Sequence, residues 1–232
     1  MYQVTVFCDL SKAFDTISQE ILLHELSVLG IRGPAYKWFE SYLGSRRQYT
    51  KYKNAKSSSL YVKSGVPQGS ILGPILFLIY INDIVCISNK LQFILYADDT
   101  TVIYQSRSLS DLLYIMNTEL IHLSNWLKSN RLSLNIAKTN FMISVLLMTQ
   151  PPTANIRMNG ISLKQVNDVK FLGVVIDSKL KWKSHIEDVT AKLAKLRGVL
   201  FKLRNCMSVE CMKQLYLSLV YPHLLHSSNS LG

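Results

Sequence analysis

The chain has 232 residues, 48% of them hydrophobic, so it can bury a sizeable core in one large domain or two. Its 26 Lys and Arg residues against 15 Asp and Glu give a formal net charge of +11, which favours a polyanionic partner such as nucleic acid, although an anionic membrane surface fits the same charge. Four cysteines without a CxxC pair or a nearby His argue against a zinc finger and indicate reduced thiols in an intracellular protein of the cytoplasm or nucleus. No secretory signal peptide is evident at the N-terminus.

The chain opens on a strand, residues 3–8, that is apolar on both faces and ends at Asp9. A strand of this kind belongs in the middle of a sheet, so we expect Asp9 to leave the sheet at its C-terminal edge. Apolar residues at helical spacing predict a helix over residues 18–29, and a Gly-Pro pair begins a second helix over residues 33–44. We expect both helices to pack against the core and to carry no chemistry.

Residues 32–63 contain eight basic residues, one acidic residue and seven interleaved aromatic residues. We expect a hairpin here with strands at residues 46–53 and 58–63 and a turn at 54–56. Basic side chains contact phosphates and aromatic rings stack on bases, so the segment fits a nucleic-acid surface. A solvated edge hairpin protected by its lysines fits the same pattern equally well.

The segment 64–82 carries no charge and would be flagged as a membrane span by hydropathy. Its glycines and prolines break the segment, and Asp83 follows at once. We therefore reject a spanning helix and expect a glycine-rich loop that leads into a buried helix over residues 75–87.

Two short segments rich in β-branched, aromatic and other apolar residues, 91–95 and 100–104, read as strands on either side of Asp98 and Asp99. The two acids then lie at a hairpin tip, where a tight turn can aim both carboxylates at one ligand. Two such charges about 4 Å apart repel by roughly 4 kcal/mol at an effective dielectric of ~20, so the pair favours a bound cation. A solvated surface turn is the alternative; the apolar flanks weigh against it, and a third carboxylate is needed to decide.

Further along, leucines and other apolar residues predict an amphipathic helix over residues 110–128 that packs on the core. Residues 132–135 and 141–147 are strand candidates. Residues 149–153 contain two prolines and are expected to form a loop.

The last part of the chain reads as hairpins and a helix. Asn159-Gly160 between apolar segments is a strong signal for a two-residue hairpin turn. Residues 169–176 read as an apolar strand interrupted by Gly173, and residues 185–203 as a final helix with lysines beside its apolar side.

Five segments together resemble a known family. They are residues 7–15 around Asp9, residues 64–70 (SGVPQGS), Tyr96-Ala97-Asp98-Asp99, Leu134-Asn135 with Lys138-Thr139, and Phe171-Leu172-Gly173. In this order and spacing they are similar to motifs A to E of reverse transcriptases. The amino-acid sequence of the motifs and their flanks resembles the polymerase of non-LTR (LINE-type, Jockey-like) retrotransposons. The resemblance covers nearly the whole chain, and five motifs in order are very specific.

This resemblance implies an α+β polymerase palm, with an antiparallel sheet backed by helices, followed by the helical start of a thumb. The implied domains are a palm over residues 1–183 and a partial thumb over residues 184–232. The implied function is RNA-directed DNA polymerase activity, with an RNA template, a DNA primer and dNTPs as partners and no membrane. Two Mg²⁺ ions, or Mn²⁺ in their place, neutralise charge on the attacking and leaving oxygens in such an enzyme.

The resemblance also implies roles for single residues. Asp9, Asp98 and Asp99 are the implied catalytic metal ligands, completed by the carbonyl of Leu10. Contacts to the nucleotide are implied for Leu10, for Phe14 as a steric gate that selects deoxynucleotides, for Gln68 and Gly69 in the glycine-rich loop, and for Lys138 as a proton donor to pyrophosphate. Apart from the family, Phe14 reads as a core aromatic residue and Lys138 as a surface lysine.

Primer and template contacts are implied for two groups of residues. One group is basic, in the expected hairpin and the final helix, and the other is the motif E hairpin; the residues are Arg46, Arg47, Phe171, Leu172, Gly173, Lys192 and Lys195. The family carries a fingers region before motif A, and this chain begins only eight residues before Asp9. We therefore expect an internal fragment that covers the palm and part of the thumb.

Two other functions remain open. A catalytically inactive fragment or a domesticated nucleic-acid-binding module is favoured by the truncation and disfavoured by the intact acids. An RNA-dependent RNA polymerase or a maturase is the second alternative; for RNA synthesis we would expect a small polar residue in place of Phe14 and Gly in place of Ala97.

Overall fold

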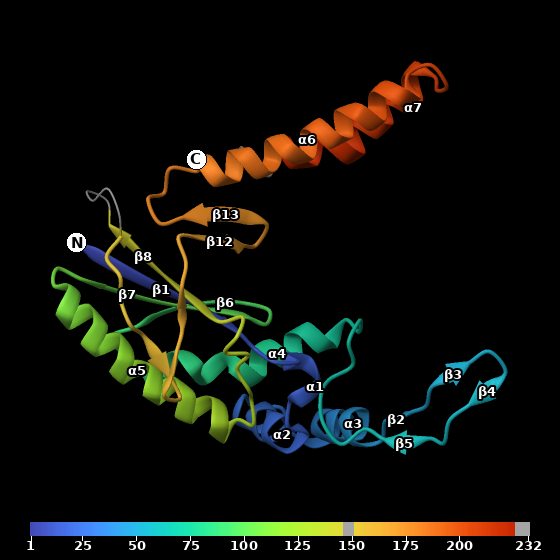
Figure 1. The fold of residues 1–232 in the computed structure, drawn as a ribbon. Coiled ribbons are helices and arrows are strands. Elements are labelled where there is room, and N and C mark those ends of the chain that lie inside the picture. Colours follow the sequence, from blue (N-terminus) through green and yellow to red (C-terminus); the bar gives the residue numbers. More distant parts are fainter. Residues whose placement is uncertain (146–150, 226–232) are drawn as a thin grey trace. The chain divides into compact units, whose positions relative to one another are not determined.

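The computed structural model describes residues 1–145 and 151–225 (Figure 1). Contacts between residues divide the chain into two compact units. Unit 1 comprises Met1–Phe141 and Thr153–Gln165, and unit 2 comprises Met142–Pro152 and Val166–Gly232. The expected division into a palm over residues 1–183 and a thumb over residues 184–232 stays a prediction.

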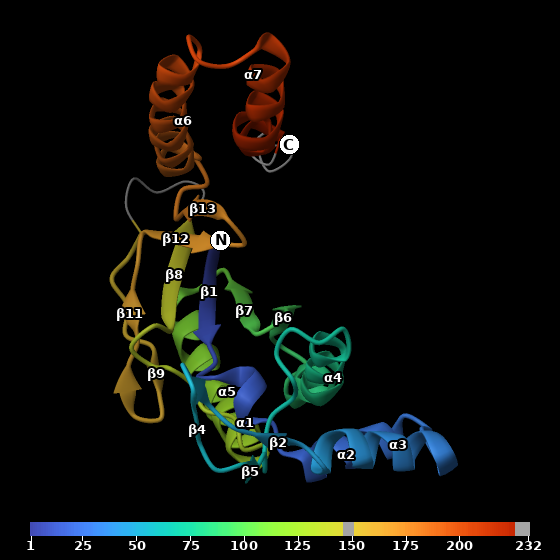
Figure 2. The same cartoon turned by 90° about the vertical axis from the view of Figure 1, so that its right-hand side faces the viewer.

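The described part of the chain has a five-stranded sheet in the order β11-β8-β1-β7-β6 (Figure 2). β1 pairs antiparallel with β7 and β7 antiparallel with β6, whereas β8 and β11 pair in parallel. The strands are β1 (Tyr2–Asp9), β6 (Gln92–Tyr96), β7 (Asp99–Ser106), β8 (Asn140–Val145) and β11 (Lys164–Gln165). With the helices described below, this sheet confirms the predicted α+β class.

β1 is a central strand, as its apolar residues on both faces predict. Val4 and Val6 on one face are fully buried, and Thr5 on the other face is 6% exposed. Cys8 is also buried, and this burial raises the pKa of its thiol to about 12, so the group stays neutral in the core. The last residue of this strand is Asp9, at the edge where the sequence places it.

The helices of unit 1 match the expected segments closely, apart from the short α1, which was not expected, and one correction. They are α1 (Ala13–Thr16), α2 (Gln19–Val28), α3 (Gly33–Gly44), α4 (Leu72–Ile81) and α5 (Leu109–Ser129). The single helix expected over residues 75–87 is wrong, because α4 ends at Ile81 and a 3-10 helix, η1 (Asn82–Ile87), follows. Asn and Asp side chains compete with helical backbone bonds, and here Asp83 accepts a hydrogen bond from the Trp126 indole at 3.0 Å instead.

α5 packs its apolar face against the sheet. Leu112, Met116 and Leu120 on that face are fully buried, and Ser108 caps the helix by accepting a hydrogen bond from the Asp111 amide. Glu119 lies on the same buried face. The predicted amphipathic helix is therefore confirmed, with one carboxylate inside its apolar face.

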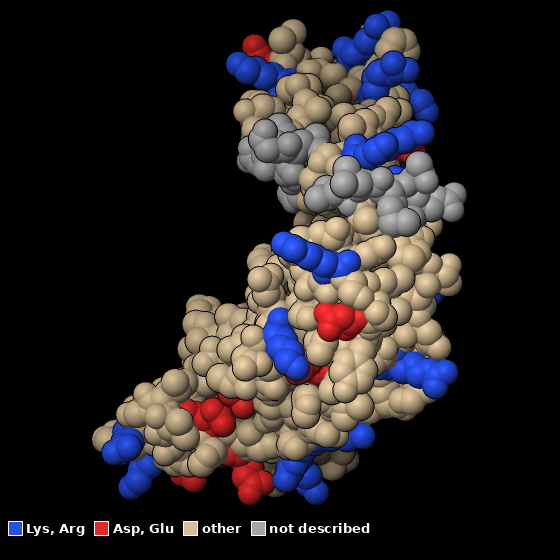
Figure 3. Space-filling model, turned by 90° about the vertical axis from the view of Figure 1, so that its left-hand side faces the viewer, with Lys and Arg blue, Asp and Glu red and all other residues tan. Residues whose placement is uncertain are grey.

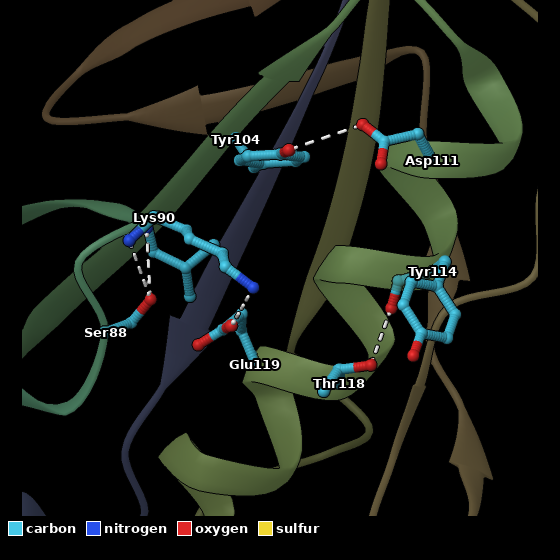
Figure 4. Close-up of polar contacts among 8 residues, drawn as sticks. Ser88, Lys90, Tyr104, Asp111, Tyr114, Thr118 and Glu119 are labelled. Atoms are coloured by element: carbon cyan, nitrogen blue, oxygen red, sulfur yellow. Dashed lines mark hydrogen bonds and ion pairs between the residues drawn. The ribbon is translucent and has the colours of Figure 1, made fainter.

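The buried carboxylate of Glu119 has a cationic partner (Figure 4). Lys90 Nζ lies 3.5 Å from it, and Lys90 belongs to the loop immediately before β6. Ser88 in the same loop accepts hydrogen bonds from the backbone amides of Lys90 and Leu91. The ion pair therefore connects α5 to the loop that begins the β6–β7 hairpin.

Three expected strands of unit 1 differ from the structure: the two of the basic hairpin and residues 132–135. The hairpin over residues 46–63 has two short ladders, and its turn is at residues 53–54 rather than at 54–56. The ladders pair β2 (Arg47–Gln48) with β5 (Leu60–Tyr61) and β3 (Lys51–Tyr52) with β4 (Ala55–Lys56). Residues 132–135 form no strand, only an isolated bridge between Leu134 and Leu10.

The β8 strand, expected over residues 141–147, begins at residue 140 and is described as far as residue 145; residues 146–150 lie outside the described chain, and with them the first two residues of the expected loop at 149–153. The hairpin turn at Asn159-Gly160 is confirmed, with β9 (Arg157–Met158) paired to β10 (Ile161–Ser162). Both turn residues have positive φ, as this turn type requires.

Unit 2 contains a hairpin and helices. The expected single strand over residues 169–176 is wrong: β12 (Asp168–Phe171) pairs antiparallel with β13 (Val174–Asp177). Leu172 and Gly173 both have positive φ and turn the chain between the strands. α6 (Lys183–Leu203), α7 (Val209–Leu215) and a π-helical segment, Tyr216–Val220, follow. Among the described helices none is long and apolar enough to cross a bilayer.

Tyr80 gives a direct test of the packing of unit 1. It is fully buried, its hydroxyl accepts from the Ser18 amide at 3.2 Å and donates to the Asn130 carbonyl at 2.6 Å, and it thereby joins α2 and α5 to α4. We expect Tyr80→Phe to lower the free energy of unfolding by about 2 kcal/mol, because two polar groups lose a buried partner. Urea denaturation measures the change. Tyr114→Phe, at an exposed tyrosine of α5, is the control and should change it by less than about 0.5 kcal/mol.

Candidate active site

The register of β1 and β7 brings two of the predicted catalytic acids together. Asp9, at the end of β1, is the direct cross-strand partner of Asp99, at the start of β7. Side chains of directly opposite residues lie on the same face of a sheet with Cβ atoms about 5 Å apart. Like charges in this position repel, so the sheet places two carboxylates where they favour a cation between them.

The third acid lies at the tip of the β6–β7 hairpin. Tyr96 pairs with Asp99, so Ala97 and Asp98 are the two turn residues. Ala97 has φ of 50°, a left-handed conformation that costs a non-glycine residue about 1 kcal/mol or more. This strained turn places Asp98 beyond the end of the sheet.

The electrostatics of Asp99 show that the acids share one environment. The pKa of Asp99 is raised above its usual value, first by burial and then by the negative charges of Asp98 and Asp9. Both other acids therefore act on Asp99 through space. An acidic cluster of this kind is stabilised by a bound cation.

A cavity of about 330 Å³ adjoins these acids. Its walls come from four places in the sequence: the end of β1, α1, the glycine-rich loop before α4, and the hairpin tip. Its lining residues are Leu10, Lys12, Ala13, Phe14, Pro67, Gln68, Gly69, Pro74 and Asp98. Five predicted site residues, from motifs A, B and C, therefore meet around one space.

Phe14 both packs in the core and lines this cavity. Its ring lies 4.9 Å from that of Phe77, measured between centroids, and Phe77 is fully buried. Phe14 itself is half-buried. The core reading and the steric-gate reading are thus compatible, because one side of the ring is packed and another faces the cavity.

Gln68 is held by a residue that the sequence did not single out. Its amide nitrogen donates to a carboxylate oxygen of Asp15 at 2.9 Å, and Ser64 in the same loop donates to the Asp15 carbonyl at 3.0 Å. Gly65 makes this approach possible: at φ of 80°, an added Cβ would lie 2.7 Å from the carbonyl oxygen of Phe14. A side chain at Gly65 would therefore clash with the backbone of α1, whereas one at Gly69 would point into open space.

The segment of motif D, residues 134–139, forms hydrogen bonds with the backbone of Asp9. The backbone amide of Asn135 donates to the Asp9 carbonyl at 2.8 Å, and the amide of Asp9 donates to the hydroxyl of Thr139 at 3.2 Å. Thr139 is fully buried. Lys138 itself is exposed and does not line the described cavity, so its predicted contact to the nucleotide has no support from this geometry.

Sequence reasoning missed three residues near the site: Lys12, Asp15 and Thr139. Lys12 adds a cation to the cavity wall, and its backbone is left-handed with φ of 49°. The segment Asp9-Leu10-Ser11-Lys12-Ala13-Phe14-Asp15 contains two of them, but polar residues after a strand end are common. Only their tertiary contacts distinguish Lys12, Asp15 and Thr139 from ordinary loop residues.

The two predicted nucleic-acid contacts in the basic hairpin differ in their environment. The Arg47 guanidinium stacks over the Tyr61 ring, 4.2 Å from its centroid. Arg46 instead donates a hydrogen bond to the carbonyl of Gly65 and so supports the motif B loop. Both Arg46 and Tyr61 line a second cavity of about 740 Å³, which shares Pro67 and Gln68 with the first.

The predicted contacts of unit 2 are on the β12–β13 turn and on α6. Phe171, Leu172 and Gly173 form the turn region, and Lys192 donates to Asp188 at 2.6 Å within the helix. Lys195 has no ion pair among the residues that the structure describes. Lys and Arg side chains gather over the helical part of the chain at the top of Figure 3.

The donor atoms of the acidic cluster fit a hard divalent cation, because carboxylate oxygens are the ligands that Mg²⁺ prefers. Within residues 1–145 and 151–225, however, no three Asp, Glu, His or Cys side chains gather closely enough to form a ready-made metal site. Convergence of Asp9, Asp98 and Asp99 on shared ions stays a prediction.

A family model described as reverse transcriptase (RNA-dependent DNA polymerase) matches residues 1–176. The chain belongs to the reverse transcriptase family. The resemblance read from the five motifs is therefore confirmed, and the Asp98-Asp99 hairpin, the cavity and the motif B loop are parts of a reverse transcriptase fold.

The relatives are proteins of mobile elements. The chain is 29% identical, over 97% of its length, to a protein of transposon BS of Drosophila melanogaster that is named a probable RNA-directed DNA polymerase. It is 26% identical over its whole length to the RNA-directed DNA polymerase from mobile element jockey of the same species. The chain spans about a quarter of the length of each of these relatives.

Among solved structures, the chain resembles Candida tropicalis telomerase in complex with a fragment of telomeric RNA. The TM-score is 0.58 at 13% identity, with 99% of this chain and 39% of that chain covered. At this identity the likeness concerns the fold alone, and it agrees with a polymerase palm.

The raised pKa of Asp99 gives a prediction for pH dependence. Because its folded pKa is raised above the unfolded value, the folded state binds more protons between the two values, and the free energy of unfolding falls as pH rises through that window. We expect Asp99→Asn to be more stable than the wild type at pH 7 and to lose this advantage below the usual Asp pKa. Urea denaturation at several pH values measures it.

The cause can be tested by NMR titration of the Asp99 carboxyl. Asp98→Asn and Asp9→Asn should each lower the pKa of Asp99, because each removes a neighbouring negative charge. Glu40→Gln, an exposed acid on α3, is the control and should leave it unchanged. An Asp99 pKa that responds equally to all three changes would contradict the shared cluster.

Proposed function

We propose that this chain forms the catalytic palm of an RNA-directed DNA polymerase of a retrotransposon, which joins a deoxynucleotide to a primer 3'-hydroxyl. The observation that carries the proposal is the cavity in which Asp98 meets Phe14 and Gln68, next to the Asp9–Asp99 pair. The family and the names of the relatives support it.

In this proposal the acids hold two Mg²⁺ ions, or Mn²⁺. Asp9 and Asp98 would be the main ligands, Asp99 the third, and the Leu10 carbonyl would complete the set. When bound, the ions neutralise charge on the attacking and leaving oxygens of phosphoryl transfer. The hydrogen bonds of Asn135 and Thr139 to the backbone of Asp9 fix the end of β1, where Asp9 is the first metal ligand in this proposal.

The cavity binds the dNTP in this proposal. Phe14, fixed on one side by Phe77, fills the space that a ribose 2'-hydroxyl would need. Gln68, held by Asp15, lies beside the nucleotide with Gly69, and Lys12 supplies a positive charge to the triphosphate. Lys138 remains a proposed proton donor only if the loop that carries it moves toward the cavity.

The primer and the RNA template occupy the basic surfaces. Arg47, which stacks on Tyr61, and Arg46, which lines the second cavity, would contact phosphates. Lys195 on α6 would contact phosphates in unit 2. Phe171, Leu172 and Gly173 would contact the primer end. Lys192 contributes less, because its charge is already paired with Asp188.

Loss of one carboxylate tests the catalytic assignment. We expect Asp98→Asn, in a protein that contains this chain and extends primers, to lower Mg²⁺-dependent dNTP incorporation by at least about a thousandfold, because one ligand of the ions is lost. Affinity for an RNA–DNA hybrid should change less than threefold. Asp83→Asn, at an acid outside the cavity, is the control. Near-normal incorporation by Asp98→Asn would refute the two-metal role of the hairpin.

The substrate choice tests Phe14. We expect Phe14→Ala to raise incorporation of GTP relative to dGTP by about tenfold or more, because it opens space at the sugar. Phe14→Tyr keeps the ring and should keep the preference for dGTP. Unchanged discrimination in Phe14→Ala, with its folding confirmed by circular dichroism, would show that Phe14 serves only the core.

A further inference from the structure

A third cavity lies away from the proposed active site, where the β9–β10 hairpin packs on α5 (Figure 2). The hairpin is fixed there by Asn117 of α5. Its side-chain amide donates to the carbonyl of Asn155 at 3.3 Å, and its side-chain oxygen accepts from the amide of Arg157 at 2.8 Å. Ser124 of α5 also bonds to the side chain of Asn159. Helix and hairpin thus form a rigid frame.

Between them is a cavity of about 410 Å³. Most of its lining residues are of polar or basic type, although their carbon atoms supply most of the lining surface; the residues are Asn117, Ile121, Ser124, Asn125, Lys128, Arg157, Asn159 and Gly160. It shares no residue with the two cavities at the proposed active site. Its size is in the range of sites that hold small ligands or single nucleotides.

The charge of this cavity has one sign. Lys128 comes from α5 and Arg157 from the hairpin, and no acidic residue lines the space. In the described chain neither cation has an ion-pair partner, and the exposed side chain of Asn125 has no hydrogen-bond partner. Two uncompensated cations and an unpaired amide therefore face the same opening.

We propose that this cavity is a second nucleic-acid site, which binds one nucleotide of a single strand outside the active site. Lys128 and Arg157 contact the phosphate, the Asn125 amide contacts a base edge, and Ile121, which is 61% exposed, packs against the base or the sugar. The choice of nucleic acid over another anion rests on the proposed function and on the net charge of +11.

A single strand fits better than a duplex. The deep, narrow major groove of an RNA duplex keeps its base edges out of reach of side chains, whereas the bases of a single strand are free to contact the Asn125 amide. The site would therefore hold a template or transcript strand beside the region that is copied. It would raise affinity without touching the reacting atoms.

Binding of a labelled single-stranded 12-mer, as RNA and as DNA, tests the proposal. We expect the double variant Lys128→Ala with Arg157→Ala to weaken RNA binding roughly tenfold. The slope of log K against log salt should fall by about 0.7, because one phosphate contact is lost and each phosphate contact in a single strand contributes about 0.7. Arg107→Ala, which removes an exposed cation before α5 that has no ion pair with any residue the structure describes, is the control and should change neither value.

Location is tested by photo-crosslinking of a 4-thiouridine RNA, followed by peptide mapping. Crosslinks in residues 117–128 or 157–160 are expected. The proposal is overturned if the double variant behaves like Arg107→Ala, if crosslinks map only elsewhere, or if polyglutamate competes as well as RNA of equal charge. Equal binding of the DNA 12-mer would retain the site but assign it to any single strand.

The RNA–DNA hybrid separates this proposal from the proposed function. Hybrid binding should be weakened by Arg47→Ala and unchanged in the Lys128 and Arg157 double variant. Loss of hybrid binding in the double variant would instead make these two residues part of the primer-template surface, and so overturn a separate single-strand site.

Discussion

The antiparallel register of β1 and β7 is the constraint on which the site depends. It sets Asp9 directly across from Asp99, and a shift of one residue would turn one carboxylate to the other face of the sheet. Packing supports the register, since Val6 and Val102 are cross-strand partners and both are fully buried. The hydrophobic core thus holds two like charges together that would otherwise separate.

Short polar connections then attach the other parts of the site to the end of β1. The motif D segment bonds to the backbone of Asp9, and the motif B loop bonds to the backbone of α1 through Gly65 and Val66. Asp15 adds a side-chain bond to Gln68. Most of these contacts involve backbone atoms, so they fix where the loops lie while leaving the side chains of the cavity to contact a ligand.

Much of the fold follows from local sequence. The central strand, the amphipathic α5 and the turns at residues 97–98 and 159–160 follow from periodicity and turn chemistry, because burial and turn geometry act over a few residues. The end of α4 does not, since Asp83 bonds to Trp126, 43 positions away. The turn at Leu172 and Gly173 follows from the family resemblance but not from the local pattern, which predicts one strand, because a Leu with positive φ is rare.

The candidate site divides in the same way. Its acids, Phe14 and Gln68 were identified through the order of five motifs, whereas periodicity alone left Phe14 as a core residue. Lys12, Asp15 and Thr139 have no distinctive local pattern, and only folding places them near the cavity or Asp9.

The central claim is that the acids form a two-ion site. Mn²⁺ binding measured by electron paramagnetic resonance, with a dNTP present, tests this claim most directly. The account predicts that the wild type binds two ions beyond any bound to free dNTP and that Asp9→Ala loses both. Equal stoichiometry of Mn²⁺ in the two proteins would contradict it.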